Sequence, residues 1–245
     1  MKASNYKNVI YSSFPWLLFV FVMGLMYFLN YSYELNYSRF GLYPRDLVGL
    51  RGILFAPFIH GSLEHLGNNS LPILILGTAL FYFYGKLGVK VFFILYFLTG
   101  LLVWLSARES YHIGSSGIVY ALAGFIFMSG ILRRAKNLVA LSLLVAFLYG
   151  SLIWGIFPIK EHVSWESHLW GGIAGFVMAW YYRKEGPQRK PYDWEFEEEQ
   201  EEEDEAYWKQ SNSIQKENLS HKRKEVPEKR IVIHYEFKDK NDKKN

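Results

Sequence analysis

Long apolar stretches separated by short polar segments fill the first three quarters of the chain. Six of them approach the length of a membrane-spanning helix, roughly 20 residues for a bilayer core of about 30 Å. The expected spans are residues 14–30, 66–84, 89–105, 115–132, 138–157 and 164–182. This pattern predicts an all-α membrane protein built as a six-transmembrane-helix bundle. Pro15 is expected in the first turn of the first helix, and Pro158 is expected to close the fifth.

Charged residues divide the chain into two unlike parts. Residues 1–182 contain twelve Lys/Arg and six Asp/Glu, whereas residues 183–245 contain fifteen and seventeen. The mean hydropathy of +0.01 therefore averages a membrane-like part and a highly charged one. We expect a cytoplasmic N-terminus over 1–13, a six-helix domain over 14–182, and a charged, disordered cytoplasmic tail after it. Within the tail, apolar and polar residues alternate over 230–237, a pattern that suits a short strand or a docking peptide.

The distribution of charge between alternate loops predicts the orientation in the membrane. With the N-terminus inside, the inner segments before the tail hold seven Lys/Arg and no acidic residue. All six acidic residues of 1–182, Glu166 among them, then fall in outer loops. Because cytoplasmic loops favour Lys and Arg, we expect both termini in the cytoplasm and the bundle in a bacterial inner membrane. The long outer segment 31–65 is rich in aromatic residues and is expected to lie at the outer leaflet.

Composition excludes several kinds of chemistry. The chain has no cysteine, which excludes disulfides, thiolate metal sites and cysteine nucleophiles. No aspartate lies in an expected span, so a paired-aspartate mechanism is unsupported, and no His-Glu-x-x-His motif indicates zinc. We therefore expect no metal and no cofactor. No patch combines basic and aromatic residues in a way that would indicate nucleic-acid binding.

Polar residues gather where three expected spans begin at the outer face, and therefore at one membrane depth. His65 and Asn69 lie one helical turn apart in and just before the second span, Ser116 opens the fourth, and His168 opens the sixth. Polar groups are costly in a membrane and usually face a bundle interior or a cavity. A serine becomes a good nucleophile when a base such as histidine takes its proton. We therefore predict Ser116 as nucleophile and His168 as base, with His65 and Asn69 as donors to the oxyanion.

Small residues predict that the helices carrying this pair lie close together. They are Gly117, Ala121 and Gly124 in the fourth span, and Gly171 and Gly175 in the sixth. Their spacing is typical of helix faces that approach closely in lipid. His168 precedes the first sixth-span glycine by three residues and is expected to face the fourth helix. Tyr120 lies one turn after Ser116, which places its ring beside the base.

These motifs resemble those of the rhomboid family of intramembrane serine proteases over about residues 10–182. The family's Gly-x-Ser-Gly motif is similar to residues 114–117, its His-x-x-Gly-x-x-x-Gly pattern to 168–175, and its His-x4-His-x3-Asn pattern to 60–69. The resemblance implies catalysis by Ser116 and His168, oxyanion binding by His65 and Asn69, and support from His60, Tyr120, Gly114, Gly117, Gly171 and Gly175. His60 is implied to be more structural than the other two residues of its motif.

The resemblance also implies an activity. It is a serine endopeptidase that cleaves single-span membrane proteins near the outer face through an acyl-enzyme, typically beside a small residue. The substrate helix has to unwind locally, because a helix shields its carbonyls from attack. The expected partners are such substrates and the lipid bilayer, and the sequence sets no oligomeric state.

Alternatives to this interpretation stay open. A catalytically silent rhomboid-like protein that binds membrane clients is expected to lack the serine or the histidine. A small transporter or channel is expected to carry polar residues through both leaflets, whereas here they gather at one end. Ser115 competes as nucleophile by adjacency, although it points about 100° away from Ser116 around the helix. The aromatic fifth span is either a lateral gate or an ordinary lipid-facing helix. Histidines expected in loops or in the tail, and therefore solvated, are His112, His162, His221 and His234.

Overall fold

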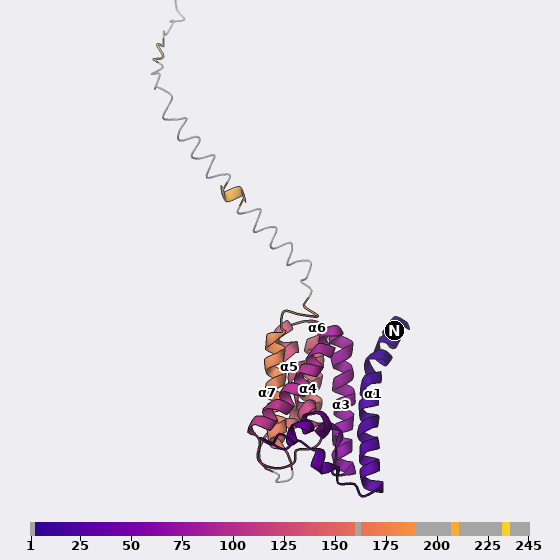
Figure 1. Cartoon of the computed structure of the whole chain (residues 1–245). Coiled ribbons are helices and arrows are strands. Elements are labelled where there is room, and N and C mark those ends of the chain that lie inside the picture. The colour runs from indigo at the N-terminus through magenta and orange to yellow at the C-terminus, as the bar shows by residue number, and fades with distance from the viewer. Residues whose placement is uncertain (1–2, 160–162, 190–206, 211–231, 236–245) are drawn as a thin grey trace, which may run out of the picture. The chain divides into compact units, whose positions relative to one another are not determined.

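The computed structural model describes residues 3–159, 163–189, 207–210 and 232–235. Within these ranges the chain is helical, and β-structure is limited to one isolated antiparallel bridge. The long helices are α1 (Ala3–Ser32), α3 (Leu63–Tyr84), α4 (Lys86–Ser106), α5 (Ser116–Arg133), α6 (Lys136–Tyr149) and α7 (Trp165–Tyr181) (Figure 1). The predicted all-α fold is confirmed.

The chain divides into two compact units, Met1–Lys190 and Pro191–Asn245. The first unit contains the six long helices. The prediction of a disordered tail, with a strand-like or docking segment at 230–237, falls mostly outside the described residues, which in the second unit are 207–210 and 232–235.

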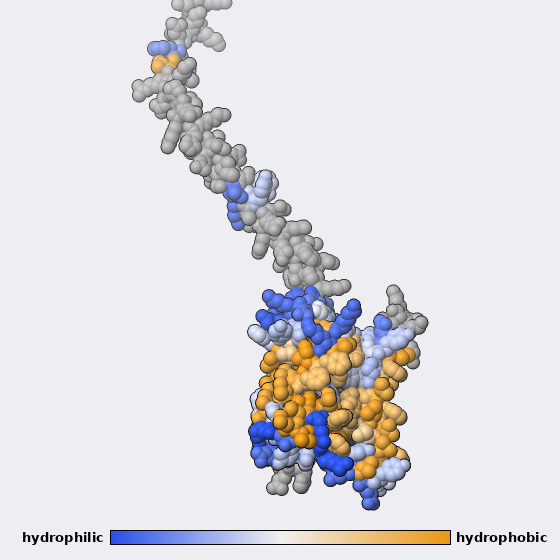
Figure 2. Space-filling model, in the orientation of Figure 1, coloured by the Kyte–Doolittle hydropathy of each residue, from blue (hydrophilic) through white to orange (hydrophobic). Residues whose placement is uncertain are grey.

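The bundle has the dimensions and surface of a membrane-embedded domain. Among the described residues, the segments long and apolar enough to cross a membrane are Asn8–Ser32, Leu63–Tyr84, Lys86–Ser106, Ser116–Arg133 and Lys136–Ile156. The sixth helix, α7, has 17 residues, and at about 1.5 Å per residue it falls a few ångströms short of a bilayer core. Figure 2 shows a belt of hydrophobic side chains between hydrophilic ends on the face in view. The chain is therefore an integral, multi-pass membrane protein.

Trp16 anchors α1 on the bundle. Its side chain is buried, and its ring lies so close to Gly77 of α3 that a Cβ there would collide with the indole. Phe81 of α3 and Phe92 of α4 flank the same ring, each with 4.8 Å between ring centroids. Lipid tails are as apolar as this interface, so the contact depends on close packing rather than on removal of water.

α5 is the most enclosed helix and packs most extensively against α7. Gly171 of α7 faces the carbonyl of Gly117, and Gly175 faces the carbonyl of Ala121. A Cβ at either α7 glycine would collide with the α5 backbone. The predicted small-residue contact between the fourth and sixth helices is therefore confirmed, and it brings together the two helices that carry Ser116 and His168.

Two helix boundaries differ from the predicted ones. α1 begins at Ala3, so Pro15 lies inside the helix and not in its first turn. A hydrophobicity pattern locates the apolar part of a helix, while hydrogen bonding can extend the helix into polar residues before it. α6 ends at Tyr149, and the chain continues as the 3-10 helix η4 (Gly150–Ile156) instead of an α-helix running to Pro158. Glycine is a poor helix former, which weakens the α-helix at this junction.

The segment between α1 and α3 folds into short turns on the end of α4. It contains η1 (Tyr37–Phe40), η2 (Gly49–Arg51), α2 (Gly52–Phe55) and η3 (Ala56–Phe58). Leu42 and Ala56 are buried with Val103 of α4. Leu47 and Val48 point outward and are exposed. Exposed apolar side chains suit a segment at the lipid interface, and its location at the outer leaflet stays a prediction.

Candidate active site

Ser116 and His168 meet at one end of the bundle. Ser116 is the first residue of α5, and His168 lies in the first turn of α7. The distance from His168 Nε2 to Ser116 Oγ is 2.8 Å, which is a hydrogen bond. His168 is 8% exposed, so its ring is largely shielded from bulk solvent. The two residues predicted as nucleophile and base are therefore in direct contact.

A backbone carbonyl sets the tautomer of His168. The second ring nitrogen, Nδ1, lies 2.8 Å from the carbonyl oxygen of Gly155 in η4. A carbonyl can only accept, so Nδ1 carries the proton and donates it to this bond. In the neutral ring Nε2 then has a free lone pair, and Ser116 Oγ–H donates to it. This is the arrangement that a general base toward serine requires.

Tyr120 braces the same imidazole from one side. Its ring stacks on that of His168 with 4.2 Å between centroids and 6° between planes. The Tyr120 hydroxyl donates to the carbonyl of Leu152 at 2.6 Å. Two carbonyls of η4, those of Leu152 and Gly155, thus hold the base and its neighbour. A Cβ at Gly155 would collide with the Tyr120 hydroxyl and lie 3.0 Å from His168 Nδ1, so this approach requires glycine.

His65 and Asn69 lie beside the backbone that precedes Ser116. The hydroxyl of Ser62 caps α3 by accepting from the backbone N–H of His65 at 3.1 Å. Gly114 has a φ of +97°, and a Cβ there would lie 2.6 Å from His65 Nε2 and 3.3 Å from Asn69 Nδ2. Asn69 Nδ2 is buried and has no hydrogen-bond partner among the described residues. Its N–H groups are therefore available to an oxyanion formed at this position.

His60 lies behind His65 rather than in the cavity over the dyad. It is 2% exposed, and its ring contacts that of His65 edge-on with 4.9 Å between centroids. Burial is the main cause that lowers the pKa of His60 to about 4, and the charge of a protonated His65 lowers it further. The backbone of Phe58 acts in the opposite direction. A buried, neutral histidine agrees with the more structural role that the sequence predicts.

Acidification is expected to destabilise the fold through His60. Its pKa is about 4 in the folded protein and near 6.5 when exposed, so below pH 6.5 the unfolded state binds a proton that the folded state does not. Stability is unaffected above that pH and falls as the pH drops toward 4, by about 2 kcal/mol between pH 7 and 5. Thermal unfolding in detergent at several pH values measures this slope, to which His112, whose pKa is also lowered by burial, contributes. His60→Asn should flatten it, and an unchanged slope would contradict the assignment.

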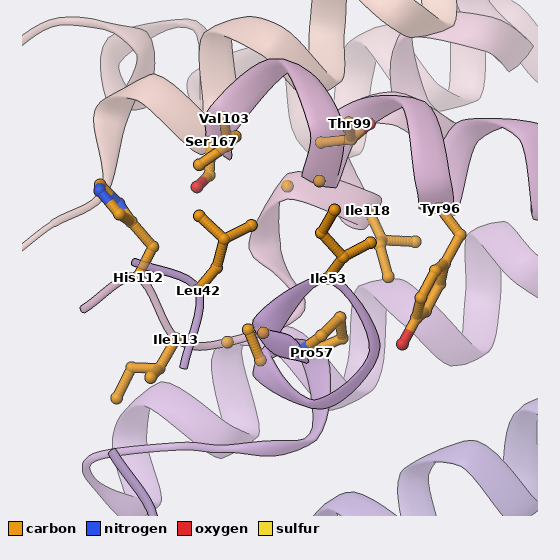
Figure 3. Close-up of a pocket in the computed structure, with 15 residues that line it drawn as sticks. Leu42, Ile53, Pro57, Tyr96, Thr99, Val103, His112, Ile113, Ile118 and Ser167 are labelled. Atoms are coloured by element: carbon orange, nitrogen blue, oxygen red, sulfur yellow. The ribbon is translucent and has the colours of Figure 1, made fainter. Parts of the chain in front are cut away.

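Two cavities lie at the dyad's end of the bundle, and the dyad lines one of them. The larger, of about 800 Å³, is lined by Ser116, His168, Tyr120, His65 and Asn69 among others. The smaller, of about 40 Å³, borders Gly117 and lies between α4 and the segment after α1 (Figure 3). Its volume is that of a few water molecules at most. The larger cavity is therefore the one that can admit a polypeptide to Ser116.

The structure changes the interpretation of two other polar residues and agrees with that of a third. His112 was predicted to be solvated, which is wrong: it is 4% exposed, because a backbone bridge to the segment after α1 draws its loop inward. Glu166, expected in an outer loop, lies in the first turn of α7 and is 5% exposed. Ser115 points away from the dyad as predicted, with Oγ 3.8 Å from a methionine sulfur of α1. Of the remaining loop or tail histidines, His234 is exposed, and His162 and His221 lie outside the described residues.

Comparison with known proteins identifies the family of this chain. The family model of the Rhomboid domain matches residues 49–185, more than half of the chain. The chain belongs to the rhomboid family. An uncharacterised protein of Mycobacterium bovis is 32% identical over 180 residues, which cover 69% of this chain and 74% of that protein.

Two further relatives match shorter parts of the chain. An uncharacterised protein of Mycobacterium leprae is 32% identical over 151 residues, covering 58% of this chain and 59% of its own. RHOMBOID-like protein 4 of Arabidopsis thaliana is 25% identical over 157 residues, covering 57% of this chain and 38% of its own. All the predicted site residues, from His60 to Gly175, lie within the rhomboid domain match, whereas α1 precedes it.

Sequence reasoning missed the contribution of η4. Leu152 and Gly155 act on the site through main-chain carbonyls, and a carbonyl has no side-chain signature. The one available signal was Gly155 itself, a glycine in an otherwise bulky stretch. Such a glycine often marks a close backbone approach.

Proposed function

We propose that this rhomboid protein is an intramembrane serine endopeptidase that uses a Ser116–His168 dyad. The observation that carries the proposal is the 2.8 Å contact between His168 Nε2 and Ser116 Oγ, with Nδ1 bound to a carbonyl. A silent client-binding relative has no need for a histidine held in the tautomer that accepts a serine proton. That precise arrangement favours catalysis.

The first half of the proposed reaction forms an acyl-enzyme. His168 Nε2 takes the hydroxyl proton as Ser116 Oγ attacks the carbonyl carbon of the scissile peptide bond. The oxygen becomes an oxyanion, to which Asn69 Nδ2 and His65 Nε2, where protonated, donate hydrogen bonds. When the C–N bond breaks, the imidazolium gives its proton to the departing amine. The substrate's N-terminal part stays esterified to Ser116.

The second half returns the enzyme to its starting state. Water attacks the ester carbon, and His168 Nε2 takes one of its protons. The resulting oxyanion is bound by the same donors. Collapse breaks the bond to Ser116 Oγ, which regains its proton from His168, and releases a carboxylic acid. Throughout both halves the Gly155 carbonyl stabilises the imidazolium, a role that an aspartate plays in triads.

The position of the dyad supports a substrate class. α3, α5 and α7 all begin at the dyad's end of the bundle, as the chain order of six alternating helices requires. A single-span membrane protein presents a peptide segment at this depth when the end of its helix unwinds into the larger cavity. With the charge distribution of the loops, this end is the outer face, and both termini are cytoplasmic.

Covalent labelling tests the proposal without a known substrate. A fluorophosphonate is expected to label the wild-type protein in detergent at one site, because an activated serine is phosphonylated much faster than an ordinary hydroxyl. Ser116→Ala should abolish the labelling. The matched control is Ser115→Ala, since Ser115 points toward α1 and should leave labelling intact. Absence of labelling in the wild type, or labelling that persists in Ser116→Ala, would contradict the dyad.

A further inference from the structure

A second group of polar residues, two of them buried, lies next to the dyad and has no part in the reaction above. It joins the loop between α4 and α5 to the start of α7. Its members are Arg108, His112, Ser164, Glu166 and Ser167. His112 is 4% exposed and Glu166 is 5% exposed, so burial of both demands compensating partners.

The contacts of His112 fix its tautomer. Nε2 lies 3.0 Å from the carbonyl oxygen of Arg108, which can only accept, so Nε2 carries the proton. Nδ1 is then an acceptor, and it lies 2.5 Å from the hydroxyl of Ser164. Ser164 therefore donates to His112 and accepts from the Ser167 hydroxyl at 2.6 Å. The result is a directed chain of hydrogen bonds from α7 to the loop before Ser116.

Arg108 ties the same two elements together by charge. Its guanidinium donates to the carbonyl of Val163 at 2.9 Å and lies 3.6 Å from the carboxylate of Glu166. Its backbone N–H approaches the same carboxylate at 3.5 Å. Because Glu166 is buried, this ion pair is less screened than one on the surface. The loop thus holds α7 on both sides of residue 164.

Both ends of the hydrogen-bond chain lead directly to the dyad. His112 is four residues before Ser116, in the loop that delivers it. Ser164 occupies the N-cap position of α7, and its carbonyl accepts from the backbone N–H groups of Ser167 and His168. Figure 3 shows His112 extending from the loop on the side of the small cavity where Ser167 lies.

The glycine contact between α5 and α7 does not by itself prevent one helix from sliding along the other. The hydrogen bonds from His112 through Ser164 to Ser167 restrict that movement. Gly171 and Gly175 set how near the helices approach, but a smooth glycine face lets one helix slide or turn against the other. A displacement of about 1 Å at a reacting pair can cost about a hundredfold in rate. The contact at 2.8 Å between Ser116 and His168 therefore needs a second constraint along the helix axis.

We propose that His112 is a positioning residue of this active site. Through Ser164 it holds the first turn of α7 in register with the first residue of α5, and so keeps His168 Nε2 within reach of Ser116 Oγ. The inference rests on the proposed function, since it concerns the geometry of the same dyad.

Labelling rates and thermal unfolding of Ser164 variants test this role. Ser164→Ala removes the donor to His112 and is expected to slow fluorophosphonate labelling by about tenfold or more. With a cleavable reporter, kcat should fall by more than KM rises, because Ser164 lies at the wall of the larger cavity but acts mainly on the geometry of the dyad. Ser164→Thr keeps the hydroxyl at a position where threonine is tolerated, and should restore most of the rate.

The matched control is Ser106→Ala. Ser106 accepts a hydrogen bond from Trp170 Nε1 at 2.6 Å, so this change also removes a serine contact between the end of α4 and α7. It lies outside the His112 chain and should leave the labelling rate within about twofold of wild type. Equal slowing in both alanine variants, or wild-type labelling in Ser164→Ala, would overturn the positioning role. A wild-type protein that does not label would instead refute the dyad itself.

A second pair of variants tests the positioning role of His112 if Ser164→Ala does not fold. His112→Asn keeps an acceptor near the position of Nδ1, whereas His112→Gln places its amide near that of Nε2. The proposal expects faster labelling in the asparagine variant, because only that one preserves the bond to Ser164. Equal rates in the two variants would overturn it.

Discussion

His168→Ala is expected to lower the rate of cleavage of a single-span reporter by about a thousandfold or more. Without the imidazole, Ser116 Oγ–H loses its acceptor at 2.8 Å, and the departing amine loses its proton donor. Both half-reactions become slower, because His168 Nε2 accepts and returns a proton in each of them. Tyr120 cannot substitute, since its hydroxyl already donates to the carbonyl of Leu152.

The measurement is reporter cleavage in liposomes, with membrane insertion and thermal unfolding of each variant followed in parallel. The control is His234→Ala, because His234 is exposed and lies outside the bundle's helices. That variant should cleave at the wild-type rate. A His168→Ala protein that inserts normally and still cleaves at that rate would exclude His168 as the base.

Gly171→Ala is expected to reduce activity by about a hundredfold and to lower the melting temperature. The added Cβ would collide with the carbonyl of Gly117, a backbone atom that cannot rotate away. α7 has to move off α5, and overpacking of this kind costs about 1–3 kcal/mol. The same movement lengthens the contact between Ser116, which is next to Gly117, and His168, which lies one turn before Gly171.

Gly172→Ala is the matched control for this change. It makes the same substitution at the next position of α7, where a Cβ would meet nothing within 4 Å. Alanine is the better helix former, so this variant should be as active as wild type and slightly more stable. Reporter cleavage and thermal unfolding distinguish the two. Equal behaviour of Gly171→Ala and Gly172→Ala would show that the α5–α7 contact does not control the dyad.

Much of the fold follows from the sequence because lipid imposes a simple rule. A helix must be apolar along its whole span, so apolar length and alternating loops locate six helices in order. Polar residues are rare at membrane depth, and those that occur stand out. Ser116 and His168 are visible for that reason, and the glycines of both helices indicate that they meet.

Hydrogen bonds formed by the main chain escape the same reasoning. The η4 segment looks like the end of an apolar helix, and only its fold brings the Gly155 carbonyl to His168. His112 looks like an ordinary loop histidine, since the bridge to Leu42 that buries it joins residues 70 positions apart. Glu166 is expected in an outer loop from the charge distribution alone, which does not show that Arg108, 58 residues earlier, pairs with it.

The use of a main-chain acceptor at Gly155 affects how mutations can inactivate the protein. A codon change that replaces a side chain cannot delete a carbonyl, and among such changes only those at Gly155 itself would push this acceptor away from the base, because a Cβ there collides with the Tyr120 hydroxyl. Loss of one residue within 150–156 would instead shift the acceptor by several ångströms. Damage from short in-frame deletions there should therefore exceed the damage from single substitutions at the positions other than Gly155.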